Sequence, residues 1–278
     1  MKVGRTPPWM MFNTGTMVAV DLNADLAEGD TLTAKDQSVL DVITSASLAC
    51  GFHAGNREVM RATAAACVAR GVTIGAHVSY PDRVGFGRSP VDRTPSQLVD
   101  DIIEQYETLS NEVSAAGGTV AYVKPHGALY NQMGVSSEVA AAVIEALSLQ
   151  GIGALMAQAG TVVVESARRA GLRVVLEGFP DRGYRFDGLL VERSQTGAVI
   201  HDPTVVGQRA VSLVQRGGIE AVDGSWTVIE AESLCVHGDT PAAAETARTV
   251  RSALEAQGIT LRSFLPADQE GTAEPRSP

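Results

Sequence analysis

Short apolar runs alternate with segments of helical periodicity along most of this chain. Seven runs are typical of buried strands, and they lie at Val18–Leu22, Ala46–Ala49, Val72–Ala76, Val120–Val123, Ile152–Met156, Arg173–Leu176 and Leu234–Val236. A helical segment follows most of them, and glycines stand where several of these segments end. A strand followed by a helix, repeated about seven times, predicts a parallel sheet with helical crossovers.

Several local patterns sharpen the expected element boundaries. Arg57–Arg70 places its apolar residues on one helical stripe, and Asn56 stands where a cap is needed. Thr94-Pro95-Ser96-Gln97 is a capping box with proline at the first helical position, so a helix should begin there. Trp226–Ile229 has the composition of a small additional strand. Lys35–Thr44 and Ser137–Leu149 are also expected to be helical.

Polar residues gather just after the strands rather than before them, which is where α/β barrels and doubly wound sheets place their sites. We therefore expect an α/β barrel of seven or eight strands, formed by a single domain over residues 17–265. An open sheet is the alternative, because periodicity alone does not show closure. Residues 1–16 are expected to be a loose extension, with Met17 a candidate start, and residues 266–278 a disordered tail.

Composition narrows the class of partner. The 278 residues carry a formal net charge of -10, which disfavours binding to nucleic acid or to anionic membranes through a general basic field. The three cysteines are widely spaced, so they predict neither a disulfide framework nor a zinc knuckle. No apolar run is long enough to span a membrane. These features together predict a cytoplasmic protein.

Histidines recur at the strand ends. His53 lies between two glycines in the segment Ala49–Asn56, and His77, His126 and His237 each follow a predicted strand directly. One histidine in such a place is most often structural, but four at equivalent places predict that at least two of them line one pocket. Cys50 and Cys235 also stand at strand ends, and we interpret them as small core residues.

Acidic residues follow the first strand with period two. Asp21, Asn23 and Asp25 would share one face of an extended chain, where they favour general base chemistry or cation binding, with a turn-forming cluster as the alternative. Asp21 together with His53, His77 and His126 is the candidate set for a divalent metal. The spacing does not require a metal, because the chain lacks an HExxH motif.

Cations are local and few. Lys124 at the fourth strand end is a candidate for holding a carboxylate or phosphate, or else a solvated surface lysine. Gly85-Phe86-Gly87-Arg88 is weak support for a phosphate contact, because neither phosphate-binding glycine motif is present. Arg182 and Arg193 are expected to pair with the nearby Asp181 and Asp187.

Several long motifs in order resemble the LamB/YcsF family, which forms the A-type subunit of bacterial ATP-dependent 5-oxoprolinase. The resemblance runs from about Val18 to Leu265 and is carried by residues 21–28, 49–55, 75–77, 85–88, 124–131 and 235–239. The chain departs from the usual family pattern at Ala24, Ala27, Val78-Ser79 and Pro180, where the family has cysteine, glycine, Pro-Gly and alanine. These small changes affect the expected shape of the pocket and leave the expected reaction class unchanged.

The resemblance implies a seven-stranded (β/α) barrel of the glycoside hydrolase/deacetylase type. It also implies cleavage of 5-oxo-L-proline to L-glutamate, with ATP as co-substrate and subunits B and C as partners. Candidate catalytic residues are Asp21, Asp25, His53, His77 and His126. Candidate substrate-binding residues are Asn23, Arg88, Lys124, Tyr130, His237 and Asp239. Two alternatives stay open: a metal-dependent deacetylase-like hydrolase acting alone, and a non-catalytic subunit that binds substrate.

Overall fold

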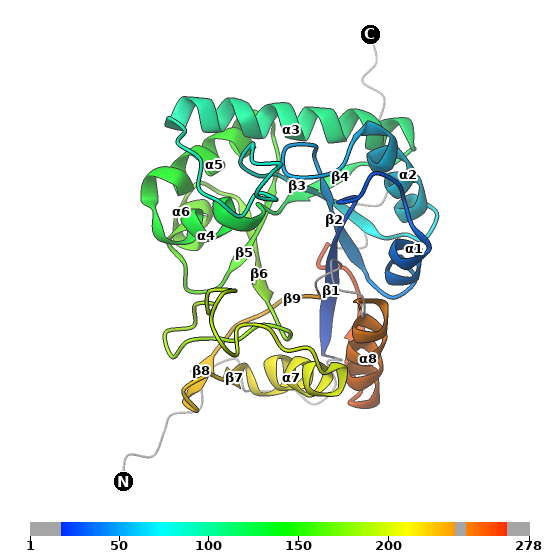
Figure 1. The fold of residues 1–278 in the computed structure, drawn as a ribbon, viewed down its shortest axis with the longest axis vertical. Coiled ribbons are helices and arrows are strands. Elements are labelled where there is room, and N and C mark those ends of the chain that lie inside the picture. The colour runs from blue at the N-terminus through cyan, green and yellow to red at the C-terminus, as the bar shows by residue number, and fades with distance from the viewer. Residues whose placement is uncertain (1–17, 237–242, 266–278) are drawn as a thin grey trace.

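Seven parallel strands close into a barrel, and helices surround it (Figure 1). The structure, a computed structural model, describes residues 18–236 and 243–265. In this part of the chain the barrel strands, in their order around the barrel, are β1 (Ala19–Leu26), β2 (Ser45–Ala49), β3 (Thr73–His77), β4 (Val120–Val123), β5 (Ala154–Gln158), β6 (Arg173–Gly178) and β9 (Ser233–Cys235). The expected barrel is confirmed, and the open sheet is excluded.

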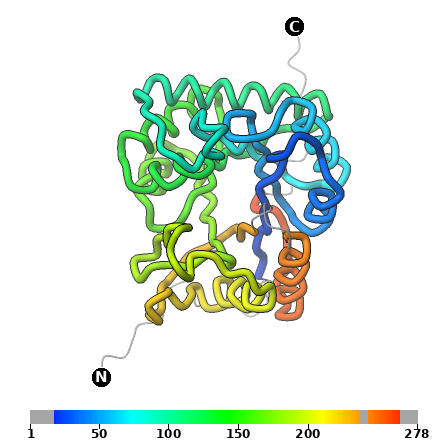
Figure 2. Tube along the Cα trace, in the orientation of Figure 1, coloured from blue at the N-terminus to red at the C-terminus, as the bar shows by residue number. Residues whose placement is uncertain are grey.

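Closure is made where the last barrel strand meets the first. β9 pairs in parallel with β6 on one side and with β1 on the other, where Asp21 aligns with Ser233 and Asn23 with Cys235. Figure 2 shows the dark-blue segment of β1 beside the orange segment of β9. A short strand, β10 (Thr260–Leu261), extends the edge of β1 at its amino end. Residues more than 200 positions apart thus lie side by side.

The helices cover the outside of the barrel. They are α1 (Ala34–Leu40), α2 (Arg57–Val68), α3 (Pro95–Ala115), α4 (Gly127–Val135), α5 (Ser137–Leu149), α6 (Val162–Arg169), α7 (Pro203–Arg216) and α8 (Ala243–Ala256). A small antiparallel hairpin, β7 (Gly218–Glu220) with β8 (Trp226–Val228), lies outside the barrel. Among the described residues, no helix combines the length and the apolar character needed to cross a membrane.

The caps that the sequence predicts are present. Asn56 Oδ1 accepts from the Val59 amide at 3.0 Å, and Thr94 and Gln97 satisfy each other's backbone amides. The strand expected at Val18–Leu22 is longer, so Asp21, Asn23 and Asp25 lie within β1 rather than in a turn after it. The helix expected over Lys35–Thr44 ends at Leu40, and α4 was not predicted.

Two apolar cores support the barrel. The larger one lies between the strands and the helices. The smaller one comprises Tyr122, Ala154, Met156 and Val175, from strands β4, β5 and β6. Gly75 of β3 leaves room for the Tyr122 ring, since a Cβ there would stand 2.3 Å from it.

The turn that follows β1 strains one residue. Ala27 has φ of 60°, in the left-handed region where glycine is favoured. We expect Ala27→Gly to raise the free energy of unfolding by up to about 1 kcal/mol, because relief of this strain outweighs the extra freedom glycine gives the unfolded chain. Urea unfolding measures the change. Ala24→Gly, within β1, is the matched control and should be destabilising; equal losses in both variants would contradict the assignment.

Candidate active site

A cavity of about 500 Å³ opens at the carboxyl ends of the barrel strands. Its lining includes Asp25, Glu28, His77, Arg88, Lys124 and His126. These residues come from β1 and the turn after it, from β3, from the loop after β3, and from the segment after β4. Parallel strands direct their carboxyl ends to one rim, so residues distant in sequence meet there.

Lys124 is the centre of the buried polar network. Its Nζ lies 2.8 Å from Asp25 Oδ1, 2.7 Å from Glu177 Oε1 and 3.1 Å from Asn23 Oδ1. The Cys235 sulfur lies 3.2 Å away. The lysine side chain is only 3% exposed, so these protein atoms replace its hydration shell. The surface-lysine alternative is therefore wrong for Lys124.

The charge on Lys124 is secured by its neighbours. Burial by itself would lower the lysine pKa, but the negative charges of Asp25 and Glu177 outweigh burial and hold that pKa well above its usual value. Tyr130 is buried next to Glu177, and burial followed by the charge of Glu177 raises the tyrosine pKa. The lysine is a permanent ammonium that orients two carboxylates.

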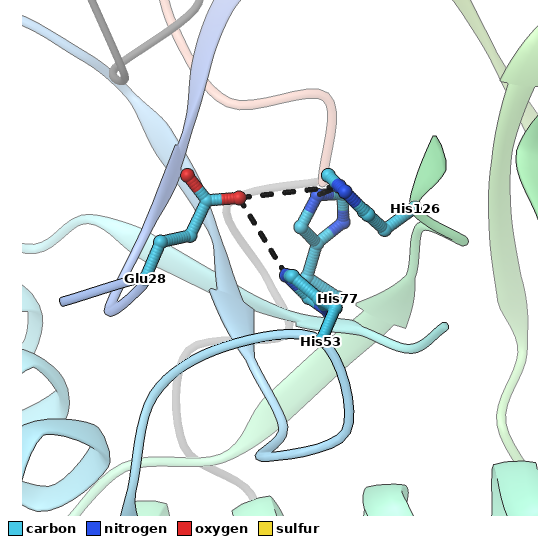
Figure 3. Close-up of side chains that lie close together, drawn as sticks. All are labelled: Glu28, His53, His77 and His126. Carbon is cyan, nitrogen blue, oxygen red and sulfur yellow. Dashed lines mark hydrogen bonds and ion pairs between the residues drawn. The ribbon is translucent and has the colours of Figure 1, made fainter. Parts of the chain in front are cut away.

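Three histidines meet above this network. The rings of His53 and His126 stack with centroids 4.1 Å apart, and His77 stands edge-on to both, at 5.4 Å and 4.7 Å. Figure 3 shows the three imidazoles converging, with the Glu28 carboxylate beside them. Glu28 Oε1 lies 3.5 Å from His53 Nε2 and 3.9 Å from His126 Nδ1. The structure thus brings the three strand-end histidines together.

Each imidazole also makes a hydrogen bond with the nitrogen that points away from the other rings. His53 Nδ1 lies 2.9 Å from Ser79 Oγ, His77 Nδ1 lies 2.8 Å from the backbone oxygen of Lys124, and His126 Nε2 lies 2.9 Å from the backbone oxygen of Phe86. The opposite nitrogens of the three rings face inward. His77 Nε2 is 2.9 Å from His126 Nδ1 and 3.3 Å from Asp25 Oδ2.

Burial keeps two of these imidazoles neutral. Burial, followed by the neighbouring His126 and His77, lowers the pKa of His53 far below its usual value. Burial, followed by His77, lowers the pKa of His126 to about 3. At neutral pH both rings therefore present a lone pair, which suits a proton acceptor or a metal ligand.

The loop after β3 packs directly on the histidines. A Cβ at Gly87 would stand 2.8 Å from His126 and 2.9 Å from His53, so only glycine fits at this position. Gly87 itself has φ of 65°, and its backbone oxygen accepts from the Ala128 amide. The Gly85–Arg88 motif was weak support for a phosphate contact in the sequence. In the structure this segment packs against His53 and His126 and hydrogen-bonds to His126.

Asp21 lies away from this group. It precedes Asp25 by four residues along β1, which is about 13 Å of strand. Its carboxylate accepts from the hydroxyls of Thr44, Ser45 and Ser233. In the group of possible metal ligands, Glu28 stands where the sequence-based set had Asp21. Glu28 was missed because the strand was expected to end at Leu22.

The other candidate residues differ in their access to the cavity. Arg88 and Tyr130 line it, whereas Asn23 is fully buried and donates to Glu177 Oε1 and Ser233 Oγ. His237 and Asp239 lie outside the described residues. Arg182 lines the cavity but donates to the backbone oxygens of Ala198 and Val191, and Arg185 is the residue that pairs with Asp187.

Comparisons with known proteins agree on one family. The model of the LamB/YcsF family matches residues 20–269. The chain is 49% identical over 251 residues to an A-type 5-oxoprolinase subunit of Pseudomonas syringae pv. tomato, covering 89% of this chain and 98% of that protein. It is 41% identical to a lactam utilization protein from Thermus thermophilus, whose crystal structure matches with a TM-score of 0.84 over 89% of this chain and all of that one.

A more distant structure shows the fold alone. A putative cellobiose-phosphate cleavage protein from Enterococcus faecalis matches with a TM-score of 0.52 at 13% identity, over 89% of this chain and 98% of that one. The barrel architecture is therefore shared well beyond proteins of similar sequence.

Asp21 gives the fold a measurable pH dependence. Burial raises its pKa from 3.8 to about 6, against the opposing effect of its hydroxyl donors. Because the folded pKa exceeds the unfolded one, the stability this group contributes is present below about pH 4 and is lost as the pH rises through 6, by about 3 kcal/mol. We expect Asp21→Asn to remove this loss.

The measurement is urea unfolding of both proteins between pH 4 and pH 7. The stability of the variant relative to the wild type should rise by about 3 kcal/mol across that window. Groups that titrate identically in both proteins cancel in this difference. A difference that does not change with pH would show that Asp21 is already ionised in the folded protein at pH 4.

Proposed function

Since the chain belongs to the LamB/YcsF family, we propose that it is the A-type subunit of an ATP-dependent 5-oxoprolinase. It would open the lactam ring of 5-oxo-L-proline to give L-glutamate, together with subunits B and C. The observation that carries the proposal is identity of 49% to an A-type 5-oxoprolinase subunit over 98% of that protein's length. The polar cavity at the barrel rim supplies the chemistry that the reaction needs.

The reaction requires activation of a stable amide. Transfer of a phosphoryl group from ATP to the lactam oxygen would make the ring carbon electrophilic. Water then adds to that carbon, the carbon–nitrogen bond breaks, and the nitrogen takes a proton as it becomes the amine, which leaves an acyl phosphate on the opened chain. A second water cleaves this acyl phosphate to give glutamate and phosphate, and ADP is released. We assign the ATP site to the assembled enzyme, because this chain has neither common phosphate-binding motif.

Proton transfer in this scheme falls to residues at the rim. Asp25 lines the cavity, and its carboxylate can accept the proton of the attacking water. His77 lies 3.3 Å from Asp25 and 2.9 Å from His126, so the two imidazoles orient this carboxylate and the water at the cavity wall. His53 stacks on His126. Asp21 is bound by hydroxyl groups inside the barrel, so we assign it no part in the proton transfer.

Binding of the substrate carboxylate falls to Arg88. Its guanidinium lies 5.0 Å from the centroid of the Phe86 ring, at the wall of the cavity beside His126. Lys124, the candidate from the sequence, has its ammonium surrounded by Asp25, Glu177 and Asn23. We therefore assign Lys124 to positioning these carboxylates. Tyr130 forms part of the cavity wall beside Glu177.

A metal-dependent amide hydrolase that acts alone is the second candidate. The convergence of Glu28 with three histidines favours it, because such a group can activate water when it holds an ion. This candidate predicts amide hydrolysis without ATP and without partner subunits. A third, a non-catalytic subunit that only binds substrate, predicts that substitutions in the cavity alter KM and leave kcat nearly unchanged.

One assay separates these functions. Glutamate release from 5-oxoproline is measured with the chain alone and with subunits B and C, each with and without Mg-ATP. The proposal predicts release only in the complete mixture with ATP. Release by the chain alone without ATP would identify the independent hydrolase, and full activity of subunits B and C without this chain would overturn the proposal.

His126 provides the sharpest test of a catalytic role. We expect His126→Ala, assembled with the partner subunits, to lower kcat at least ~10²-fold, because an imidazole that lines the cavity and orients the groups that transfer protons is lost. His201→Ala is the matched control, since His201 is exposed in the segment before α7 and should leave kcat unchanged. Wild-type turnover by a folded His126→Ala protein would remove His126 from the mechanism.

A further inference from the structure

The backbone and hydroxyl contacts behind the three imidazoles determine which nitrogen of each carries hydrogen. A carbonyl oxygen only accepts, so His77 donates from Nδ1 to Lys124 and His126 donates from Nε2 to Phe86. The Ser79 hydroxyl donates its single hydrogen to the backbone oxygen of Tyr80, so it accepts a hydrogen bond from His53 Nδ1. In the neutral rings, the three inward nitrogens are therefore bare.

These bare nitrogens face one another and a carboxylate. His77 Nε2 and His126 Nδ1 lie 2.9 Å apart, with a lone pair on each. His53 Nε2 is buried without a hydrogen-bond partner, and the nearest charged atom is the carboxylate oxygen of Glu28 at 3.5 Å. Four electron-rich atoms that converge without a shared hydrogen repel one another unless a cation lies between them.

Carboxylates stand beside these nitrogens. Glu28 Oε1 lies 3.5 Å from His53 Nε2, and Asp25 Oδ2 lies 3.3 Å from His77 Nε2. The two carboxylate side chains are 14% and 11% exposed, so solvent screens their charge little. A cation held by the inward nitrogens would be stabilised by these charges.

We propose that His53 Nε2, His77 Nε2, His126 Nδ1 and a Glu28 oxygen bind one divalent transition-metal ion. The ligand atoms all lie within 4.8 Å of one another. Two nitrogens at about 2.1 Å from a common ion stand about 3.0 Å apart when they subtend a right angle, close to the separation of His77 and His126. Metal-bound histidines are typically oriented by a hydrogen bond at the ring nitrogen that does not bind the metal. The three rings make such bonds here, to two backbone oxygens and one hydroxyl.

The donor set selects the ion. Three imidazole nitrogens and one carboxylate oxygen suit Zn²⁺, Co²⁺, Ni²⁺ or Fe²⁺, whereas Mg²⁺ and Ca²⁺ prefer oxygen ligands. A proton shared by His77 and His126 is the competing explanation. It would satisfy that pair, but it would leave the bare His53 Nε2 facing the Glu28 carboxylate oxygen. A metal ion satisfies all four atoms at once, whatever reaction the cavity performs.

The test is a Co²⁺ titration of the untagged, chelator-treated chain, followed by visible absorption and calorimetry. We expect saturation at one equivalent, with visible bands that Zn²⁺ abolishes by displacement. His77→Ala should weaken binding by more than the ~10–100-fold typical of losing an outer-shell partner, since it removes a ligand. Glu28→Gln keeps the size of the side chain, removes its charge, and should also weaken binding.

His201→Ala is the control for adventitious binding at an exposed histidine, and its titration should match the wild type. Circular dichroism shows whether each variant is folded, and Glu28→Gln decides the question if His77→Ala is not. Failure of the wild type to take up one equivalent would overturn the proposal, as would equal binding by the wild type and Glu28→Gln. The readout does not require turnover, so it stands apart from the 5-oxoprolinase assay.

Discussion

The ion pair of Lys124 with Asp25 and Glu177 is the interaction on which the site depends. All three side chains are nearly or fully buried, and a buried charge is tolerated only when it is paired and hydrogen-bonded. They come from strands β1 and β6 and from the end of β4, and Asn23 and Cys235 complete the contacts where β1 meets β9. The same network that satisfies the lysine therefore lies across the seam that closes the barrel.

The histidine group is built on this network. The backbone oxygen of Lys124 fixes one nitrogen of His77, and Asp25, which pairs with the lysine ammonium, lies beside the other. His77 in turn contacts His126, whose far nitrogen is held by the loop at Phe86. Gly87 lets this loop approach both rings. A disturbance at Lys124 would thus reach the rim through both its side chain and its backbone.

The sequence predicted the barrel and a pocket shared by at least two strand-end histidines, because both follow from where polar residues stand after apolar runs. It did not predict which acid joins them. Period-two spacing places Asp21 and Asp25 on one face of a strand, but it does not give their height in the barrel, which depends on where the strand ends. Glu28 and the carbonyl of Phe86 belong to turns, and Glu177 lies in β6 just beyond Leu176, where the strand was expected to end. Their roles become visible only in three dimensions.

The central claim is that the inward nitrogens of three histidines and the Glu28 carboxylate bind one metal ion. X-ray diffraction from crystals of the chain grown with Zn²⁺, recorded on both sides of the zinc absorption edge, tests this most directly. We expect one strong anomalous peak, about 2.1 Å from the inward nitrogens of His53, His77 and His126. An anomalous map without a peak among these rings, or with peaks only at surface residues, would contradict the claim.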